Sequence, residues 1–234
     1  MLAIILDTET HDMKGNAVEI AYYPFCFTDG IGQHDTKNGF KQRFNPGAPM
    51  AIGAMATHHI LDSDVAGCCP HTEFSLSDLG QPVEYLIGHN IDYDIAVLER
   101  ADVDVSNIKA ICTLAMARKL WPEFESRTIS YLVYALTPDK AIAREQIKNA
   151  HSAWQDILMT GFILDQILLK TGIKSIKDLH LFSEIARLPE KLTFGKYIGT
   201  AIADVPADYV RWLAGQAKVD PYLIKAFRAA GFKV

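Results

Sequence analysis

The chain has 234 residues, 49% of them hydrophobic, and a net charge of −5 at neutral pH. This length and composition allow one complete α/β core with a small additional module, and they exclude a miniature domain that depends on disulfide staples. The cysteines follow neither a C-x-x-C metal spacing nor a disulfide framework, which favours a reducing, cytoplasmic setting. They are Cys26, Cys68, Cys69 and Cys112.

Charge is divided unevenly along the chain. Residues 1–173 carry 13 Lys and Arg against 22 Asp and Glu, a net charge of −9, whereas residues 174–234 carry 10 against 6, a net charge of +4. Because phosphates attract positive surfaces, the C-terminal part is the better candidate for contact with nucleic acid, although a solvated basic face has the same composition. We expect two domains, residues 1–172 and 173–234, joined near Thr171-Gly172.

Strands and helices alternate along the first domain. The apolar run Met1–Leu6 predicts a buried strand rather than a signal peptide or membrane span, because Asp7 and Glu9 end it after a few residues. This alternation indicates one α/β layer structure. Further strands are predicted at 17–23, 84–88 and 108–112, and helices at 52–60, 92–100, 113–120 and 152–169.

The first candidate functional residues stand at the end of the opening strand. Asp7 and Glu9 are two positions apart, so both side chains lie on one face of the strand. Two crowded carboxylates repel each other unless a cation neutralises them, and carboxylate oxygens are ligands that Mg²⁺ and Mn²⁺ prefer. For this pair alone, two solvated acids at a strand end are the alternative interpretation.

Two further carboxylates lie near the beginnings of helices. Asp94 ends the segment His89–Asp94, where a strand gives way to a helix, a frequent position for active-site residues in α/β proteins. Asp156 lies about one and a half turns inside an apolar helix that begins after His151, where a buried charge needs a partner or a metal ion. Taken singly, Asp94 could be a favourable charge at a helix start, and His151 and Asp156 a capping residue and a surface acid.

Taken together, these motifs resemble those of the histidine-type DEDD exonuclease superfamily. They are Asp7-x-Glu9, His89-Asn90-x-x-Tyr93-Asp94 and His151-x-Ala153-x-x-Asp156, and the resemblance spans about residues 1–170. It implies a ribonuclease-H-like fold, in which a mixed central β-sheet is flanked by helices, followed by a small basic C-terminal module. The segments 54–60, 112–122, 193–199 and 204–213 are similar to those of the exonuclease X-type group.

The resemblance also implies roles for individual residues. Asp7, Glu9, Asp94 and Asp156 would hold two Mg²⁺ or Mn²⁺ ions, and His151 would act as general base in releasing nucleoside 5′-monophosphates from 3′ ends. DNA with a single-stranded or frayed end is favoured over RNA, and no membrane partner is expected. One departure is His11-Asp12-Met13, which stands where the family usually has Thr-Gly-Leu. Substrate contacts are expected from Thr8, Thr10, Met13, His58, Asn90 and Lys196.

The C-terminal module combines Lys196, in a glycine-containing loop, with several aromatic side chains. The lysine could bind backbone phosphates while bases stack on the rings. Alternatively, the rings could form a hydrophobic cluster packed on the nuclease core. The aromatic residues are Phe194, Tyr197, Tyr209 and Trp212.

Three other functions are compatible with the sequence. The chain could trim RNA, cleave internally as ribonuclease H does, or mainly bind a replication or repair protein. The pair His151 and Asp156 favours an exonuclease over an endonuclease. The segment Asp178–Phe182 faintly resembles a peptide that docks on bacterial sliding clamps, but an ordinary helix with Leu179 and Phe182 inward explains it more simply.

Overall fold

The protein consists of two compact units in the computed structural model, which describes residues 2–148, 150–217 and 219–234. The units are residues 1–183 and 184–234, whereas the sequence placed the division after residue 172. Helix α8 (Ile176–Ala186) crosses this boundary. Its first part belongs to the first unit, where the buried Ser183 hydroxyl accepts a hydrogen bond from the Cys112 backbone N–H at 2.8 Å.

The first unit is built on a mixed sheet, as expected from the sequence. In the described residues the strand order is β3-β2-β1-β5-β6, and β4 pairs with β2. Strand β2 is antiparallel to β1, β3 and β4, whereas β5 is parallel to β1 and β6. The strands are β1 (Leu2–Thr10), β2 (Ala17–Thr28), β3 (Ile31–His34), β4 (Phe40–Arg43), β5 (Val83–Gly88) and β6 (Lys109–Cys112).

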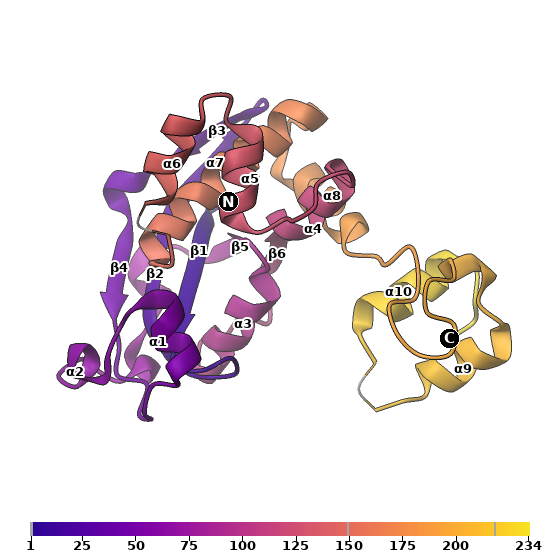
Figure 1. The fold of residues 1–234 in the computed structure, drawn as a ribbon, viewed down its shortest axis with the longest axis horizontal. Coiled ribbons are helices and arrows are strands. Elements are labelled where there is room, and N and C mark those ends of the chain that lie inside the picture. Colours follow the sequence, from indigo (N-terminus) through magenta and orange to yellow (C-terminus); the bar gives the residue numbers. More distant parts are fainter. Residues whose placement is uncertain (1, 149, 218) are drawn as a thin grey trace. The chain divides into compact units, whose positions relative to one another are not determined.

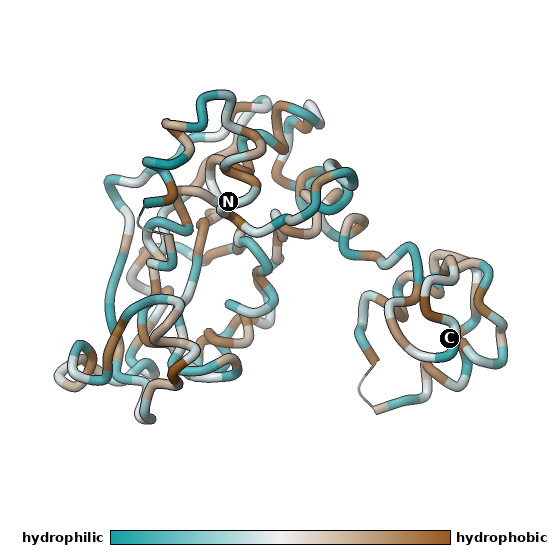
Figure 2. Tube along the Cα trace, viewed as in Figure 1, coloured by the Kyte–Doolittle hydropathy of each residue, from teal (hydrophilic) through white to brown (hydrophobic). Residues whose placement is uncertain are grey.

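Strand β1 runs through the middle of the core. Ile4, Ile5 and Leu6 are each 0% exposed. Because successive side chains of a strand point to opposite faces, their complete burial shows that both faces of the sheet are covered. The tube in Figure 2 is accordingly brown along the first part of β1 and largely teal along the edge strand β4.

Helices pack on this sheet as an α/β layer structure (Figure 1). Helix α7 lies against β1 and β2 and is itself contacted by α4, α5 and α6, while α3 packs against β1, β5 and β6. The helices are α1 (Ile52–His58), α2 (Asp62–Val65), α3 (Ile91–Arg100), α4 (Thr113–Leu120), α5 (Ile129–Leu136), α6 (Lys140–Ile147) and α7 (Ala153–Thr171). Short 3-10 helices occupy Thr36–Asn38, His71–Glu73 and Ser77–Leu79.

The long helix α7 begins without a cap from its own N-cap residue. Ser152 occupies the N-cap position, but its side chain makes no capping hydrogen bond. The serine hydroxyl instead donates to the Glu19 carboxylate at 3.2 Å. At the other end Gly172 adopts a left-handed conformation, with φ at 65°, and ends the helix.

The second unit has a small core of its own. Helices α9 (Ala207–Ala214) and α10 (Pro221–Ala229) and a 3-10 helix at Ile202–Asp204 surround it. Tyr197 and Tyr209 pack against this core and against each other, with ring centroids 4.8 Å apart. These two rings therefore belong to the packing of the unit itself. The core comprises Leu192, Ile202, Val205, Val210, Leu213, Leu223, Ala226 and Phe227.

The cysteines and the helices give two further structural facts. All four cysteines carry free thiols, in agreement with the lack of a disulfide framework in the sequence. Across the described ranges, no helix combines the length and the apolar character needed to cross a bilayer.

Candidate active site

The end of β1 extends beyond its parallel neighbour. Pairing with β5 reaches Ile5, opposite Ile87, while pairing with β2 continues to Thr10. The last residues of β1 are therefore flanked by a strand on one side and by the loop and helix that follow β5 on the other. Side chains from this helix can approach Asp7 and Glu9, at the carboxyl edge where α/β proteins commonly place their sites.

Asp94 is hydrogen-bonded to β1 at Thr8, the residue between Asp7 and Glu9. It lies in the first turn of α3 and is 3% exposed. One of its carboxylate oxygens accepts hydrogen bonds from the Thr8 backbone N–H at 3.0 Å and from the Thr8 hydroxyl at 2.7 Å. Thr8 thus holds Asp94 at a fixed place beside Asp7 and Glu9.

Asp156 reaches the same place from α7. Its carboxylate accepts a hydrogen bond at 3.2 Å from the backbone N–H of His151, which precedes the helix in a left-handed conformation with φ at 67°. His151 itself is exposed. The turn 151–156 therefore couples the position of the candidate base to that of a candidate ligand.

Three of the four predicted ligands form a compact group. One oxygen from each of Asp7, Glu9 and Asp156 can be chosen so that all lie within 4.8 Å of one another. Asp94 is not part of this group, but its charge is the strongest electrostatic influence on Asp7. In the described part of the chain, no Lys or Arg is ion-paired with Asp7 or Glu9.

Burial raises the pKa of every carboxyl in this set, and repulsion within the set adds to the effect at Asp7 and Glu9. The pKa of Asp7 is well above its usual value because of burial, followed by the charges of Asp94, Glu9 and Asp156. Burial and Asp156 raise the pKa of Glu9 to about 8. Burial also raises the pKa of Asp156 to about 6, and that of Asp94 to about 7 despite the hydrogen bonds from Thr8. Such a set of hard oxygen donors fits Mg²⁺ or Mn²⁺, which would neutralise it.

A cavity of about 580 Å³ opens beside Glu9. This volume lies within the usual range for small-molecule sites. Its wall combines the end of β1, the loop after it, helix α1 and one side chain of α3. The lining residues include Thr8, Glu9, Thr10, Asp12, Met13, Lys14, Ala54, Thr57, His58 and Tyr93.

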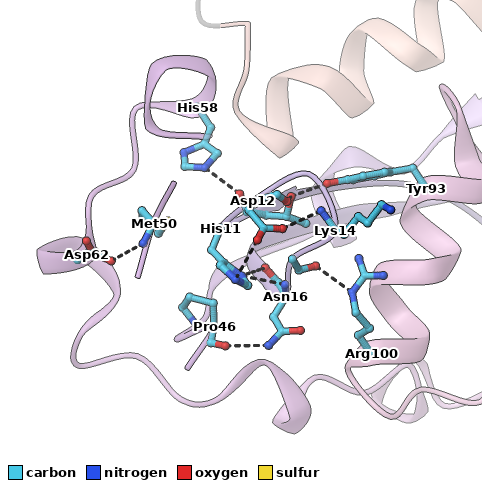
Figure 3. Close-up of polar contacts among 12 residues, drawn as sticks. His11, Asp12, Lys14, Asn16, Pro46, Met50, His58, Asp62, Tyr93 and Arg100 are labelled. Atoms are coloured by element: carbon cyan, nitrogen blue, oxygen red, sulfur yellow. Dashed lines mark hydrogen bonds and ion pairs between the residues drawn. The ribbon is translucent and has the colours of Figure 1, made fainter. Parts of the chain in front are cut away.

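The loop 11–16, which forms one rim of the cavity, is fixed by several hydrogen bonds (Figure 3). His11 and Asn16 close it through His11 N–H to Asn16 O at 3.2 Å and Asn16 N–H to His11 Nδ1 at 2.9 Å. Arg100 donates to Gly15 O at 2.9 Å from helix α3. Gly15 is required sterically, because a Cβ there would lie 2.6 Å from His11 Nδ1. Met13 is thereby held at the rim, 88% exposed.

His58 lines the cavity, but both of its ring nitrogens bond to backbone. Nδ1 accepts from the Ile60 N–H at 3.0 Å, which leaves the proton on Nε2 to be donated to Thr10 O at 3.1 Å. Burial lowers the pKa of the imidazole, so His58 is neutral at neutral pH. His58 therefore contributes a neutral ring surface to the cavity wall, not a positive charge.

The other predicted contacts are distributed differently. Thr8, Thr10 and Met13 line the cavity, whereas Asn90 is not among the lining residues and is the N-cap of α3, in a left-handed conformation with φ at 74°. Lys196 belongs to the second unit.

Sequence reasoning missed Tyr93 as a cavity residue and Glu19 as a further carboxylate beside the group. The Tyr93 hydroxyl shares a short hydrogen bond with Thr10, across the cavity wall. Glu19 is 1% exposed and lies opposite Glu9 in the β1–β2 pairing. A signal existed for Glu19, because an acid between Val18 and Ile20 in an apolar strand must find partners once it is buried.

The chain has an α/β layer structure, and its grouped carboxylates have the chemistry of a divalent-cation site. The chain is a homologue of exodeoxyribonuclease 10 of Escherichia coli strain K12, with 28% identity over 220 residues that cover 89% of each protein. The same protein of Escherichia coli O6:H1 (strain CFT073) gives the same values. The resemblance expected from the motifs is thereby confirmed.

Two other comparisons concern the fold and the C-terminal region. The structure of exonuclease X in complex with 5′ overhanging duplex DNA matches with a TM-score of 0.58 and 24% identity, covering 77% of this chain and 99% of that chain. This match confirms the predicted fold class. A family described as putative quorum-sensing-regulated virulence factor matches residues 180–218, from within α8 into the second unit.

Proposed function

We propose that the chain is a divalent-cation-dependent 3′→5′ exonuclease that releases nucleoside 5′-monophosphates. The observation that carries the proposal is the half-buried group of Asp7, Glu9 and Asp156, with Asp94 hydrogen-bonded nearby, beside a cavity of about 580 Å³. An unneutralised group of this kind opposes folding, so its presence at the end of a strand that begins with five apolar residues argues for a bound cation.

The four carboxylates are the residues that would hold Mg²⁺ or Mn²⁺. When bound, two such ions supply positive charge that polarises a phosphodiester and stabilises its leaving oxygen. Asp7 has the central place in this set, because Asp94, Glu9 and Asp156 all act on its pKa. Thr8 contributes by holding Asp94 through two hydrogen bonds, which leaves one carboxylate oxygen of Asp94 outside these bonds.

His151 is the candidate general base. An imidazole can accept a proton near neutral pH, and a base must reach the attacking water from outside the ligand group. His151 satisfies this requirement because its side chain is exposed while its backbone N–H is bonded to Asp156. Its left-handed backbone conformation, with φ at 67°, fixes the direction in which the side chain leaves the chain.

The cavity is the proposed seat of the 3′-terminal nucleotide. Met13 at its rim can pack against a base, and the joined Thr10 and Tyr93 hydroxyls offer polar atoms to the sugar and phosphate. His58 supports this wall through Thr10 O. DNA is favoured as substrate because the relatives are exodeoxyribonucleases and the solved exonuclease X structure contains duplex DNA.

An end-labelled substrate panel tests this function. With Mg²⁺, we expect stepwise release of mononucleotides from the 3′ end of linear DNA, single-stranded or frayed, and no release after chelation. RNA of the same sequence should be degraded more slowly. Cleavage of circular single-stranded DNA would instead indicate an endonuclease, and faster digestion of RNA would indicate the trimming function.

Failure of every nucleic acid to react would favour a protein that mainly binds a partner. The segment Asp178–Phe182, which faintly resembles a clamp-docking peptide, offers little support for that alternative. It lies in α8, where Leu179 is 0% exposed and Phe182 is half-buried, so the segment is packed as an ordinary helix.

The second unit offers a surface suited to nucleic acid outside the cavity. Lys196 Nζ lies 5.3 Å from the Tyr197 ring centroid, and Trp212 is 57% exposed, 5.2 Å from the Tyr209 ring. Phe194 is 46% exposed in the same loop as Lys196. Exposed rings beside a cation are a combination that binds single strands by stacking and charge.

Replacing Lys196 by Ala is expected to weaken binding of long oligonucleotides similarly for all sequences. Removal of one phosphate contact should lower the slope of log affinity against log salt concentration by about 1. Fluorescence anisotropy at several salt concentrations measures both quantities. Lys233→Ala removes the same charge from an exposed position and is the control. Equal salt slopes in Lys196→Ala and wild type would exclude the contact.

A further inference from the structure

Glu19 is a buried acid on β2 that the proposed chemistry does not use. It is 1% exposed, and its neighbours Val18 and Ile20 are each 0% exposed. In the antiparallel register it lies directly opposite Glu9. A carboxylate so placed, beside another anion, needs strong partners to remain in the folded protein.

Its two oxygens bind two different parts of the unit. Oε1 accepts hydrogen bonds from the Ala153 backbone N–H at 3.0 Å and from the Ser152 hydroxyl at 3.2 Å. Oε2 is ion-paired with Lys41 Nζ at 3.4 Å and Arg43 Nε at 3.6 Å, both on β4. Lys41 also donates to the Ser152 hydroxyl at 2.9 Å, which closes the network.

These contacts place Glu19 at the start of α7 in the role of a cap. The first backbone N–H groups of a helix lack partners within the helix, and an acceptor carried by the N-cap side chain usually satisfies one of them. Ser152 makes no such bond, and the Ala153 N–H is bonded to Glu19 instead. The negative charge also interacts favourably with the helix N-terminus.

The anchored turn carries two groups of the candidate site, His151 just before α7 and Asp156 in its first turn. His151 immediately precedes Ser152, and the Asp156 N–H bonds to Ser152 O at 3.0 Å. Asp156 in turn accepts from the His151 N–H. A shift of Ser152 and Ala153 would therefore move the proposed base and one proposed ligand together.

A direct role as a ligand does not fit Glu19. Both of its oxygens are already engaged by protein donors, and among the described residues the metal-capable group consists of Asp7, Glu9 and Asp156. We propose that Glu19 is a positioning residue, which together with Lys41 and Arg43 anchors the start of α7 and sets His151 and Asp156 against Asp7 and Glu9. Its effect on turnover rests on the proposed nuclease function, whereas its effect on the helix does not.

Three variants separate position from charge. Glu19→Ala removes all contacts. Glu19→Gln keeps the length and an amide oxygen that can accept from the Ala153 N–H, and it leaves Lys41 and Arg43 about half exposed, so water can solvate them. The control is Glu184→Gln in the second unit, where the acid is also paired with two cations, Lys225 at 2.7 Å and Arg187 at 3.5 Å.

The first measurement is amide hydrogen exchange at the start of α7, which requires no enzymatic activity. Glu19→Ala should lose protection of the Ala153 N–H and of the His151 N–H, while Glu19→Gln and Glu184→Gln keep it. Wild-type protection in Glu19→Ala would overturn the proposal whether or not the protein proves to be a nuclease. If Glu19→Ala does not fold, the folded Glu19→Gln variant serves as the test instead. Its amide oxygen should keep the hydrogen bond from the Ala153 N–H, so loss of protection of that N–H would contradict the proposal.

The second measurement is steady-state hydrolysis by the full chain. Displacement of a catalytic group by about 1 Å can reduce turnover about 10²-fold, so Glu19→Ala should lose kcat on that scale with KM little changed. Glu19→Gln should retain most of kcat, and Glu184→Gln all of it. A loss in Glu19→Gln equal to that in Glu19→Ala, with protection of the Ala153 and His151 N–H groups retained, would show that the charge acts apart from the position of the helix, and would overturn the proposal.

Discussion

Replacing Asp7 with Asn is expected to abolish hydrolysis and, at pH 8 without divalent cations, to raise the melting temperature. Asp7 is central to the carboxylate group, since the charges of Asp94, Glu9 and Asp156 all act on it. Loss of several kcal/mol of stabilisation in the transition state corresponds to at least about a 10³-fold fall in turnover. The same change removes a half-buried charge from a repulsive group, and each kcal/mol of repulsion so relieved raises Tm by roughly 2–4 °C.

The pH dependence of the metal-free protein follows from the same carboxyls. Their pKa values are raised in the folded state, to about 8 for Glu9, about 7 for Asp94 and about 6 for Asp156. The folded state therefore binds more protons than the unfolded state between about pH 4 and pH 8, and the free energy of unfolding falls as the pH rises through this range. Mg²⁺ at pH 8 should restore stability by neutralising the group.

Thermal denaturation with and without Mg²⁺, combined with end-labelled digestion, measures these effects. Asp7→Asn should also lose most of the Mg²⁺-induced increase in Tm, while Asp178→Asn, which changes an exposed acid on α8, should behave as wild type. A metal-free protein that gains stability from pH 5 to pH 8, or an Asp7→Asn variant that still hydrolyses DNA at the wild-type rate, would contradict the assigned metal centre.

The second large effect is expected from His151→Ala. Loss of a general base reduces turnover by about 10²–10⁴-fold. Because the contact between His151 and Asp156 uses the histidine backbone N–H, the substitution leaves that hydrogen bond available and should leave the Mg²⁺-induced rise in Tm unchanged.

His59→Asn is a suitable control for this experiment. His59 is exposed and also left-handed, with φ at 58°, a conformation that Asn tolerates, and it is not among the residues that line the cavity. It should keep wild-type turnover. Near-normal hydrolysis by His151→Ala would eliminate His151 as the base, and an equal loss of Mg²⁺ stabilisation would instead indicate damage to the ligand group.

The sequence predicted best those elements whose packing imposes a regular pattern. Helix α4 was placed at its observed bounds of Thr113 and Leu120, because Trp121-Pro122 cannot continue a helix. The helices α5 and α6 were missed, although each begins with a side-chain cap. Thr128 accepts from the Tyr131 N–H, and Asp139 accepts from the Ala141 N–H at 2.8 Å.

At the site, spacing indicated which residues share a face but not what each one contacts. The separation of Asp7 and Glu9 was sufficient to place them together, since a strand alternates with a period of two. The attachment of Asp94 to Thr8 and of Glu19 to the start of α7 joins residues 86 and 134 positions apart. No local pattern specifies such contacts, because they depend on the packing of elements that are distant in the chain.

The hydrogen bonds that fix loop 11–16 reduce the entropy cost of binding a ligand in the cavity. Its closure by His11 and Asn16, together with the bond from Arg100 to Gly15, leaves the backbone beneath Met13 little conformational entropy to lose when the cavity is filled. Most of the contact energy at this rim is then available as affinity, without a cost for ordering the loop. In the proposed exonuclease reaction this docking would recur for each nucleotide removed, so a rim that is already ordered would avoid that entropy loss each time.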